Sequence, residues 1–124
     1  MIMRCAVFSL VLLFAPLACN AEIAGVWKHA KTPVWLEILP HKGSAIVVRN
    51  DQHPNRVGRE VLKTIKADSR QQNLWQALFY IEKLGEYKRV KIALPETDRM
   101  LITGKVGFIS RSVEWVRADS LPAR

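Results

Sequence analysis

The chain has 124 residues, with 19 Lys and Arg against 11 Asp and Glu, so its formal net charge is +8 at pH 7. This length suits one domain and excludes a dinucleotide-binding domain joined to a separate substrate domain. An apolar share of 49% with 24% charged residues is typical of a globular protein, which excludes wholesale disorder and a fibrous repeat.

The N-terminal segment has the layout of a secretory signal peptide. A basic start at Arg4 precedes an apolar stretch over 6–15, and a short, turn-prone segment over 16–21 follows. The apolar stretch is shorter than the roughly 20 residues that a membrane-spanning helix needs. We therefore predict a signal peptide over 1–21 and a single exported domain over 22–124, in the periplasm or secreted.

Two processing routes fit this segment. The small-x-small pattern over 19–21 predicts cleavage before Glu22. The alternative reads 17–19 as a bacterial lipobox with a lipidated Cys19, which would anchor the domain to a membrane, although Pro16 stands where lipoboxes have an aliphatic residue. Cleavage before Glu22 leaves a chain without cysteine, which excludes thiol catalysis and cysteine metal sites.

After the signal peptide, alternating and β-branched stretches separated by turn residues predict antiparallel strands. The clearest unit is a hairpin: 34–38 alternates with period two, 40–43 turns with Gly43 at a position suited to positive φ, and 45–49 returns. Further strands are expected over the ranges 24–28, 75–84, 87–94, 100–106 and 111–117.

The stretch 50–70 allows two interpretations after a loop around Pro54. Three apolar residues recur at four-residue spacing, which suits a short helix, whereas the run 61–65 also suits a strand. We favour a turn followed by a short strand. The fold class is then all-β, an antiparallel up-and-down barrel of about eight strands.

Two short motifs resemble the lipocalin and calycin signature. Gly25-Val26-Trp27 opens the first predicted strand, and Trp115-Val116-Arg117 closes the last. The motifs are also similar to those of a family of small exported bacterial proteins, grouped as a domain of unknown function, which have a late Gly-x-Val-Gly turn like that over 104–107. The resemblance covers nearly all of the chain after the signal peptide and implies a lipocalin-like barrel. It implies no activity, because that family has no agreed biochemical role.

The resemblance also implies a structural latch at one end of the barrel, formed by Gly25, Trp27, Trp115 and Arg117. Within each strand the two motif residues share a face, because alternate residues of a strand point the same way. Barrel closure joins the first and last strands. We therefore expect the Arg117 guanidinium to stack on the Trp27 indole.

The residue patterns of common catalytic and metal sites do not occur in this sequence. His29, His41 and His53 fall at predicted turns or strand ends without paired ligand spacing, so we interpret them as solvated surface residues. Glu37 and Glu114 are a candidate carboxylate pair, although exposed positions on the outer sheet face are the commoner case. No nucleophile motif or phosphate-binding glycine loop is found. We therefore predict no metal, no cofactor and no catalytic residue, hence a protein that is not an enzyme.

The basic residues gather in two small clusters, over 63–70 and 88–91. Nucleic acid is disfavoured as a partner because the chain is predicted to be exported. Anionic lipid headgroups suit the same electrostatics. A charged surface that keeps a small protein soluble is the interpretation that we favour for these clusters.

An eight-stranded barrel is either filled by its own side chains or holds one small ligand. If Trp115 faces inward, alternation also turns Arg111 inward, near the open end opposite the latch. A cation there would pair with the anionic group of an amphipathic ligand, and Trp75 and Phe79 would line its apolar part. The favoured alternative is that Arg111 belongs to the turn over 107–110 and extends into water.

These features predict a non-enzymatic envelope protein whose barrel binds a small hydrophobic or amphipathic anionic ligand. The alternative is an envelope structural or interaction protein with a filled barrel.

The signal-peptide assignment predicts the mass of the mature protein. Cleavage before Glu22 should give an unmodified chain that starts at this residue, because the small-x-small pattern ends at Ala21. Intact-mass measurement of the protein purified from the cell envelope checks this. A diacyl or triacyl adduct on Cys19 would contradict it and would tether the domain to a membrane.

Overall fold

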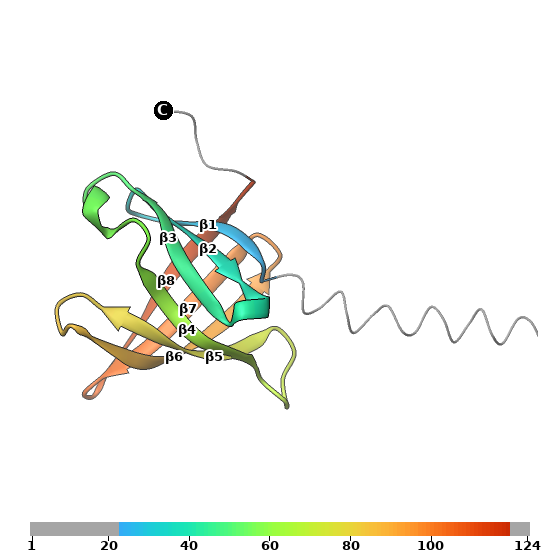
Figure 1. Ribbon diagram of the computed structural model, residues 1–124. Coiled ribbons are helices and arrows are strands. Elements are labelled where there is room, and N and C mark those ends of the chain that lie inside the picture. Colours follow the sequence, from blue (N-terminus) through green and yellow to red (C-terminus); the bar gives the residue numbers. More distant parts are fainter. Residues whose placement is uncertain (1–22, 120–124) are drawn as a thin grey trace, which may run out of the picture.

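The computed structural model describes residues 23–119, which form a closed barrel of antiparallel strands (Figure 1). The predicted signal peptide over 1–21, its cleavage site and Cys19 lie outside the described residues. The strands are β1 (Gly25–His29), β2 (Val34–Leu39), β3 (Ser44–Asn50), β4 (Glu60–Ala67), β5 (Leu74–Ile81), β6 (Glu86–Glu96), β7 (Arg99–Val106) and β8 (Ile109–Ala118). Two 3₁₀ turns, η1 (Pro40–Lys42) and η2 (Pro54–Arg56), interrupt the connections.

Each strand pairs with the next, and β8 pairs with β1, so the sheet has no free edge among the described strands. The predicted all-β, up-and-down barrel of eight strands is confirmed. The connections β1–β2, β3–β4, β5–β6 and β7–β8 lie at one end, which we call the mouth end (left in Figure 1). The other end, where β1 begins and β8 finishes, we call the latch end.

Turn chemistry sets two boundaries. Gly43 has a φ of 64°, as the turn after β2 requires, and its N–H bonds to the carbonyl of Pro40. The predicted strand over 75–84 was too long, because β5 ends at Ile81. The N–H groups of Leu84 and Gly85 both turn back to the Ile81 carbonyl, and Gly85 has a φ of 67°. The stretch after Pro54 contains one 3₁₀ turn and then β4, so the strand interpretation is confirmed and the helical alternative is wrong.

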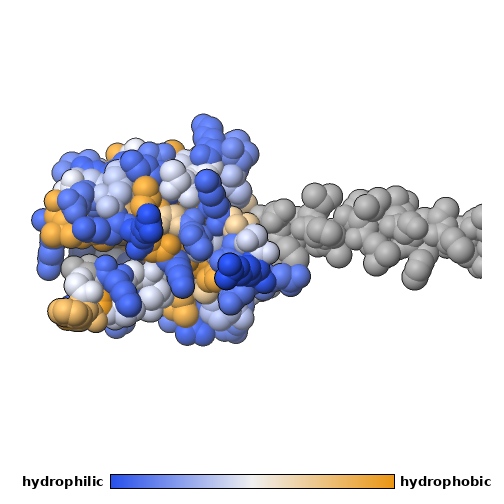
Figure 2. All heavy atoms as spheres, turned by 90° about the horizontal axis from the view of Figure 1, so that it is seen from below, coloured by the Kyte–Doolittle hydropathy of each residue, from blue (hydrophilic) through white to orange (hydrophobic). Residues whose placement is uncertain are grey.

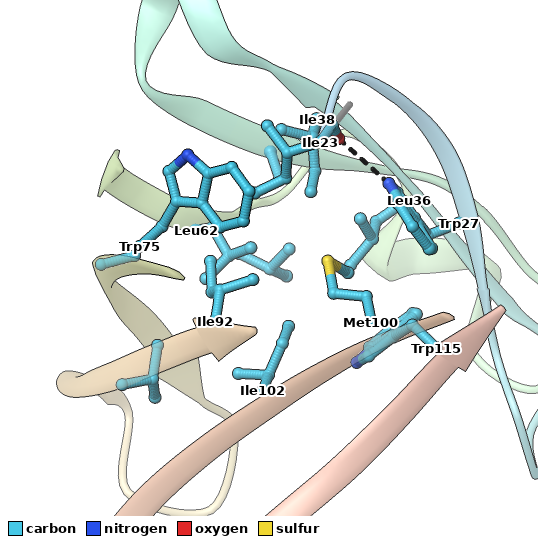
Figure 3. Close-up of a cluster of buried hydrophobic side chains, with 14 of the residues drawn as sticks. Ile23, Trp27, Leu36, Ile38, Leu62, Trp75, Ile92, Met100, Ile102 and Trp115 are labelled. Carbon is cyan, nitrogen blue, oxygen red and sulfur yellow. Dashed lines mark hydrogen bonds between the residues drawn. The ribbon is translucent and has the colours of Figure 1, made fainter. Parts of the chain in front are cut away.

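The core lies inside the barrel, where alternate residues of neighbouring strands meet (Figure 3). On β6 the buried residues are Val90, Ile92 and Leu94, the face expected from period-two alternation. The side chains that are almost fully buried are Ile23, Trp27, Leu36, Ile38, Leu62, Ile92 and Met100. Within 23–119, no helix is long and apolar enough to cross a membrane.

The latch contact expected from the sequence is present. The guanidinium carbon of Arg117 lies 4.3 Å from the centre of the Trp27 ring, and the two residues are register partners across the β1–β8 seam. Arg117 also donates hydrogen bonds from Nε to the carbonyl of Thr97 (2.8 Å) and from Nη1 to that of Ala24 (2.9 Å). Gly25 completes the contact: its φ is +116°, and an added Cβ would lie 3.5 Å from Arg117 Nη1.

Trp115 lies apart from this guanidinium contact. It pairs in register with His29 and with Met100, on the mouth side of Trp27. Its indole packs against the His29 ring instead.

The Arg117 side chain should add to the stability that packing of the Trp27 indole already provides. We expect Arg117→Ala to lower the free energy of unfolding by about 1–3 kcal/mol, because the variant loses a cation–π contact and two charge-assisted hydrogen bonds. Arg117→Lys should lose part of this, since one ammonium cannot reach both carbonyls in the fork geometry. Urea unfolding of these variants, beside the exposed control Arg111→Ala, measures the effect. Equal losses for Arg117→Ala and Arg111→Ala would contradict the latch.

Candidate ligand site at the barrel mouth

A cavity of about 170 Å³ lies at the mouth end of the barrel. Apolar side chains from five strands line it: Val34, Leu36, Val47, Val61, Phe79 and Trp115. Polar side chains form its rim: His29, Asn50, Arg56, Tyr80 and Glu82. The cavity is thus a small apolar cup with a polar edge, which is the usual composition of a small-molecule site.

The rim is held by ion pairs between two connections. The Glu82 carboxylate, after β5, forms salt bridges with Arg59 and, at 3.8 Å, with Arg56 of η2. The Arg59 guanidinium also lies 5.0 Å from the centre of the Tyr80 ring. These contacts join the β3–β4 and β5–β6 connections. They also leave two guanidinium groups sharing one carboxylate, an excess of positive charge at the rim.

Asn50 fixes the loop that follows β3. Its side chain is buried, and its Oδ1 accepts hydrogen bonds from the backbone N–H groups of Gln52 (3.1 Å) and His53 (2.8 Å). An asparagine that bonds to the backbone two and three residues ahead forms an Asx turn. The loop that carries Arg56 to the rim is therefore held from within.

Trp115 carries the one buried side-chain polar atom that has no hydrogen-bond partner within 23–119, its indole Nε1. The residue is only 4% exposed. In contrast, Nε1 of Trp27 donates to the carbonyl of Ile23 at 3.1 Å. Figure 3 shows the Trp115 nitrogen on the side of the ring turned toward Ile102 and the barrel interior. Leaving such a donor unpaired costs about 1–3 kcal/mol, which an acceptor brought against this N–H would recover.

His29 differs from the expectation of a solvated surface histidine. Its ring packs edge-on against Trp115, with ring centres 5.0 Å apart. Its Nδ1 accepts hydrogen bonds from the backbone N–H groups of Lys31 (3.0 Å) and Thr32 (3.2 Å), so the neutral ring carries its proton on Nε2. Burial, together with the positive charges of Lys28 and Lys31, lowers the pKa of His29. His41 and His53 are exposed.

The three ligand residues predicted from the sequence do not come together. Phe79 lines the cup. Trp75 is buried in the core and does not line it, and Arg111 is exposed and pairs in register with Gly104. Alternation fails to bury Arg111 because residues 109–113 all lie in an exposed part of the β7–β8 hairpin. An inward-facing strand residue is buried only where a strand on the opposite side of the barrel packs against it.

The candidate carboxylate pair is also separated. Glu37 lies beside Val26 near the start of β1, whereas the carbonyl of Glu114 bonds to Ala30 beyond its end. Glu114 pairs instead with Arg99, at 3.1 Å. Over the described residues, His, Cys, Asp and Glu form no group of three that could hold a metal ion.

Sequence reasoning missed Trp115 Nε1 and His29 as parts of this site. Trp115 was assigned to the latch because of its Trp-x-Arg motif, and the chain offered no sign that its N–H would lack a partner. The sequence shows the lysines near His29, Lys28 and Lys31, but lysines do not indicate whether the His29 ring is buried.

The lowered pKa of His29 predicts a loss of stability in mild acid. The unfolded chain takes up a proton near the ordinary pKa of 6.5, whereas the folded protein resists protonation until a lower pH. Stability contributed by neutral His29 is thus fully present above the ordinary pKa of 6.5 and falls as the pH drops below it toward the lowered pKa of the folded state. The difference in unfolding free energy between the native protein and His29→Gln should shrink over that interval. A difference independent of pH would contradict this.

Comparison with protein-family models, curated proteins and solved structures finds no match to this chain. The resemblance to lipocalins and to the exported bacterial family therefore stays a prediction. The barrel itself and the contact between Trp27 and Arg117 are observed.

Proposed function

We propose that this protein is an exported, non-enzymatic binding module that holds a small amphipathic molecule in the mouth of its barrel. The observation that carries the proposal is the buried Trp115 N–H, which has no partner among residues 23–119 and belongs to a side chain that lines an apolar cup. A ligand with one hydrogen-bond acceptor on an apolar body would satisfy this donor and fill the cup.

The volume of the cup limits the size of the ligand. At about 170 Å³ it is smaller than the pockets of roughly 300–1,000 Å³ that hold drug-sized molecules. It is close to the apolar cavity of about 150 Å³ that accepts benzene in an engineered protein. A body the size of one aromatic ring fits, whereas the whole of a long-chain fatty acid does not. The cup thus suits only the smaller of the amphipathic ligands expected from the sequence.

The charge of the rim supports an anionic ligand group. Arg56 and Arg59 share the single carboxylate of Glu82, and Lys28 and Lys31 flank His29. Arginine suits a carboxylate because its planar N–H groups match the two oxygens. A small aromatic or branched aliphatic carboxylate is therefore the class that we favour.

The second candidate is a structural or interaction protein whose barrel needs no ligand. It is favoured by the packing at the latch end, where Trp27, Ile38 and Trp75 fill the interior. In that case the unpaired Trp115 Nε1 is a cost of the packed barrel, offset by burial of the indole ring.

Benzoate is the probe that tests the proposal. The sample is the mature chain, residues 22–124. In its ¹H–¹⁵N NMR spectra the Trp115 indole N–H resonance should shift as benzoate is added, because this N–H gains an acceptor. Trp115→Phe should weaken binding about tenfold or more, the value of one hydrogen bond to a charged group. The matched control is Trp35→Phe. Trp35 is buried beneath Lys28 and Arg49 on the other face of its strand and does not line the cup.

Three outcomes distinguish the candidates. Binding that Trp115→Phe weakens and Trp35→Phe leaves unchanged supports the cup. No shift of the Trp115 resonance with benzoate, and no small molecule retained in native mass spectrometry, contradicts ligand binding and favours the filled barrel. Arg111→Ala should leave benzoate affinity unchanged, because Arg111 does not line the cup. A loss of affinity in that variant would restore the anchor predicted from the sequence.

A further inference from the structure

Two hairpin tips at the mouth end expose large apolar side chains. In the β7–β8 connection, Phe108 is 105% exposed and Ile109 is 60% exposed, and in the β5–β6 connection Leu84 is 49% exposed. Both connections project at the same end of the barrel (Figure 1). A phenylalanine that touches nothing gains no packing energy from the fold, so its burial is left to a partner.

Cations flank these apolar tips. Lys105 and Arg111 lie on either side of Phe108 and Ile109 along the β7–β8 hairpin, and Lys83 precedes Leu84; all three are exposed. Each hairpin thus places apolar side chains at its tip and cationic side chains within a few residues of them. This is the arrangement that a bilayer interface accommodates, with apolar groups below the anionic headgroups and cations among them.

The same hairpins border a broad groove on the outer face of β4 to β8. Its volume is about 900 Å³. Four cations line it: Lys66, Arg89, Lys91 and Lys105. The other lining residues are uncharged, and none of the four cations takes part in a salt bridge over 23–119.

Strand register brings these cations together from distant parts of the chain. Lys66 lies beside Gln76, Gln76 beside Lys91, and Lys91 beside Thr103, so one lateral row crosses four strands. The Asp68 carboxylate lies at the latch-end edge of this row, where its Oδ2 accepts a hydrogen bond from Nε2 of Gln76 at 3.4 Å. Figure 2, seen from below the barrel of Figure 1, shows hydrophilic side chains across this face with apolar groups between them and at its left-hand end.

We propose that the β5–β6 and β7–β8 tips and the basic groove together dock the protein onto an anionic lipid bilayer. Phe108 and Ile109 enter the headgroup region, and Lys105, Arg111 and the groove cations contact lipid phosphates. The basic groove and the exposed apolar tips both suit an anionic bilayer. A partner that bound only one of the two features would leave the other without a role. The proposal is independent of ligand binding in the cup.

A single-stranded nucleic acid fits these features less well. Proteins that bind single strands place aromatic side chains inside a basic groove, where bases stack on them. None of the residues that line this groove is aromatic, and Phe108 projects beyond it. The aromatic residue is thus placed to enter a layer beneath the charges.

Fluorescence of Phe108→Trp tests insertion of the tip. The four native tryptophans are all buried, each at most 7% exposed, so the introduced tryptophan is the one that reports on the surface. The probe is vesicles of two parts phosphatidylcholine to one part phosphatidylglycerol, with bromine atoms on the acyl chains as a quencher. We expect quenching and a shift of the emission to shorter wavelength on anionic vesicles, and neither on vesicles of phosphatidylcholine alone. The control is His41→Trp, an exposed position in η1 at the latch end, which should stay unquenched.

Vesicle flotation tests the charges and the apolar tip separately. Lys91→Gln and Lys105→Gln should each lower the partition coefficient about fivefold, the effect of one cation near an anionic surface. Phe108→Ala should lower it about tenfold. Lys42→Gln, an exposed position in η1 at the latch end, should change it little. Equal binding to neutral vesicles would overturn the proposal. A second result would also overturn it: an affinity for heparin or an oligonucleotide that equals the affinity for vesicles and does not change in Phe108→Ala. This result would identify a soluble polyanion as the partner.

Discussion

Pairing of β8 with β1 is the constraint on which the rest of this structure depends. Without it the sheet would end in two open edges, each with unpaired N–H and C=O groups. The register of this seam sets Trp27 opposite Arg117 and His29 opposite Trp115. One set of backbone hydrogen bonds thus positions both the contact that closes the latch end and the ring pair beside the cup. A slip of one residue would turn every side chain of β8 to the opposite face and remove both.

Two buried tryptophans show how position decides chemistry within one core. Trp27 and Trp115 both face the interior, and both are almost inaccessible. Trp27 lies where the chain enters the barrel, so the Ile23 carbonyl accepts its N–H, and a guanidinium covers its ring. Trp115 lies further toward the mouth, where apolar residues and His29 surround it. The first tryptophan is part of the scaffold, and the second has an indole N–H without a partner among the described residues. The proposed ligand site rests on this difference.

The charges of the protein are divided in a similar way. At the rim of the cup, Arg56 and Arg59 are engaged by Glu82, which joins two connections. On the outer face of β4 to β8, the lysines and Arg89 have no carboxylate among the residues that line their groove. The first group therefore joins the two connections and leaves one excess positive charge at the rim, whereas the second contributes to an open positive field. Because the exposed tips and the cup lie at the same end, docking through the tips would place the mouth of the barrel near the bilayer.

Local patterns of the sequence determined the strands, the turn at Gly43 and the all-β class, because alternation and turn residues act over a few positions. They also determined the contact of Trp27 with Arg117, since closing any meander joins its first and last strands. The end of β5 was misplaced because Leu84, which follows the charged pair Glu82 and Lys83, was included in the strand, whereas the chain already turns after Ile81. Only tertiary structure decided the partial burial of His29, the unpartnered N–H of Trp115, the exposure of Arg111 and the gathering of cations on one outer face. Each of these depends on which residues stand opposite or beside one another across several strands, and that is set by register and barrel closure rather than by neighbours in the chain.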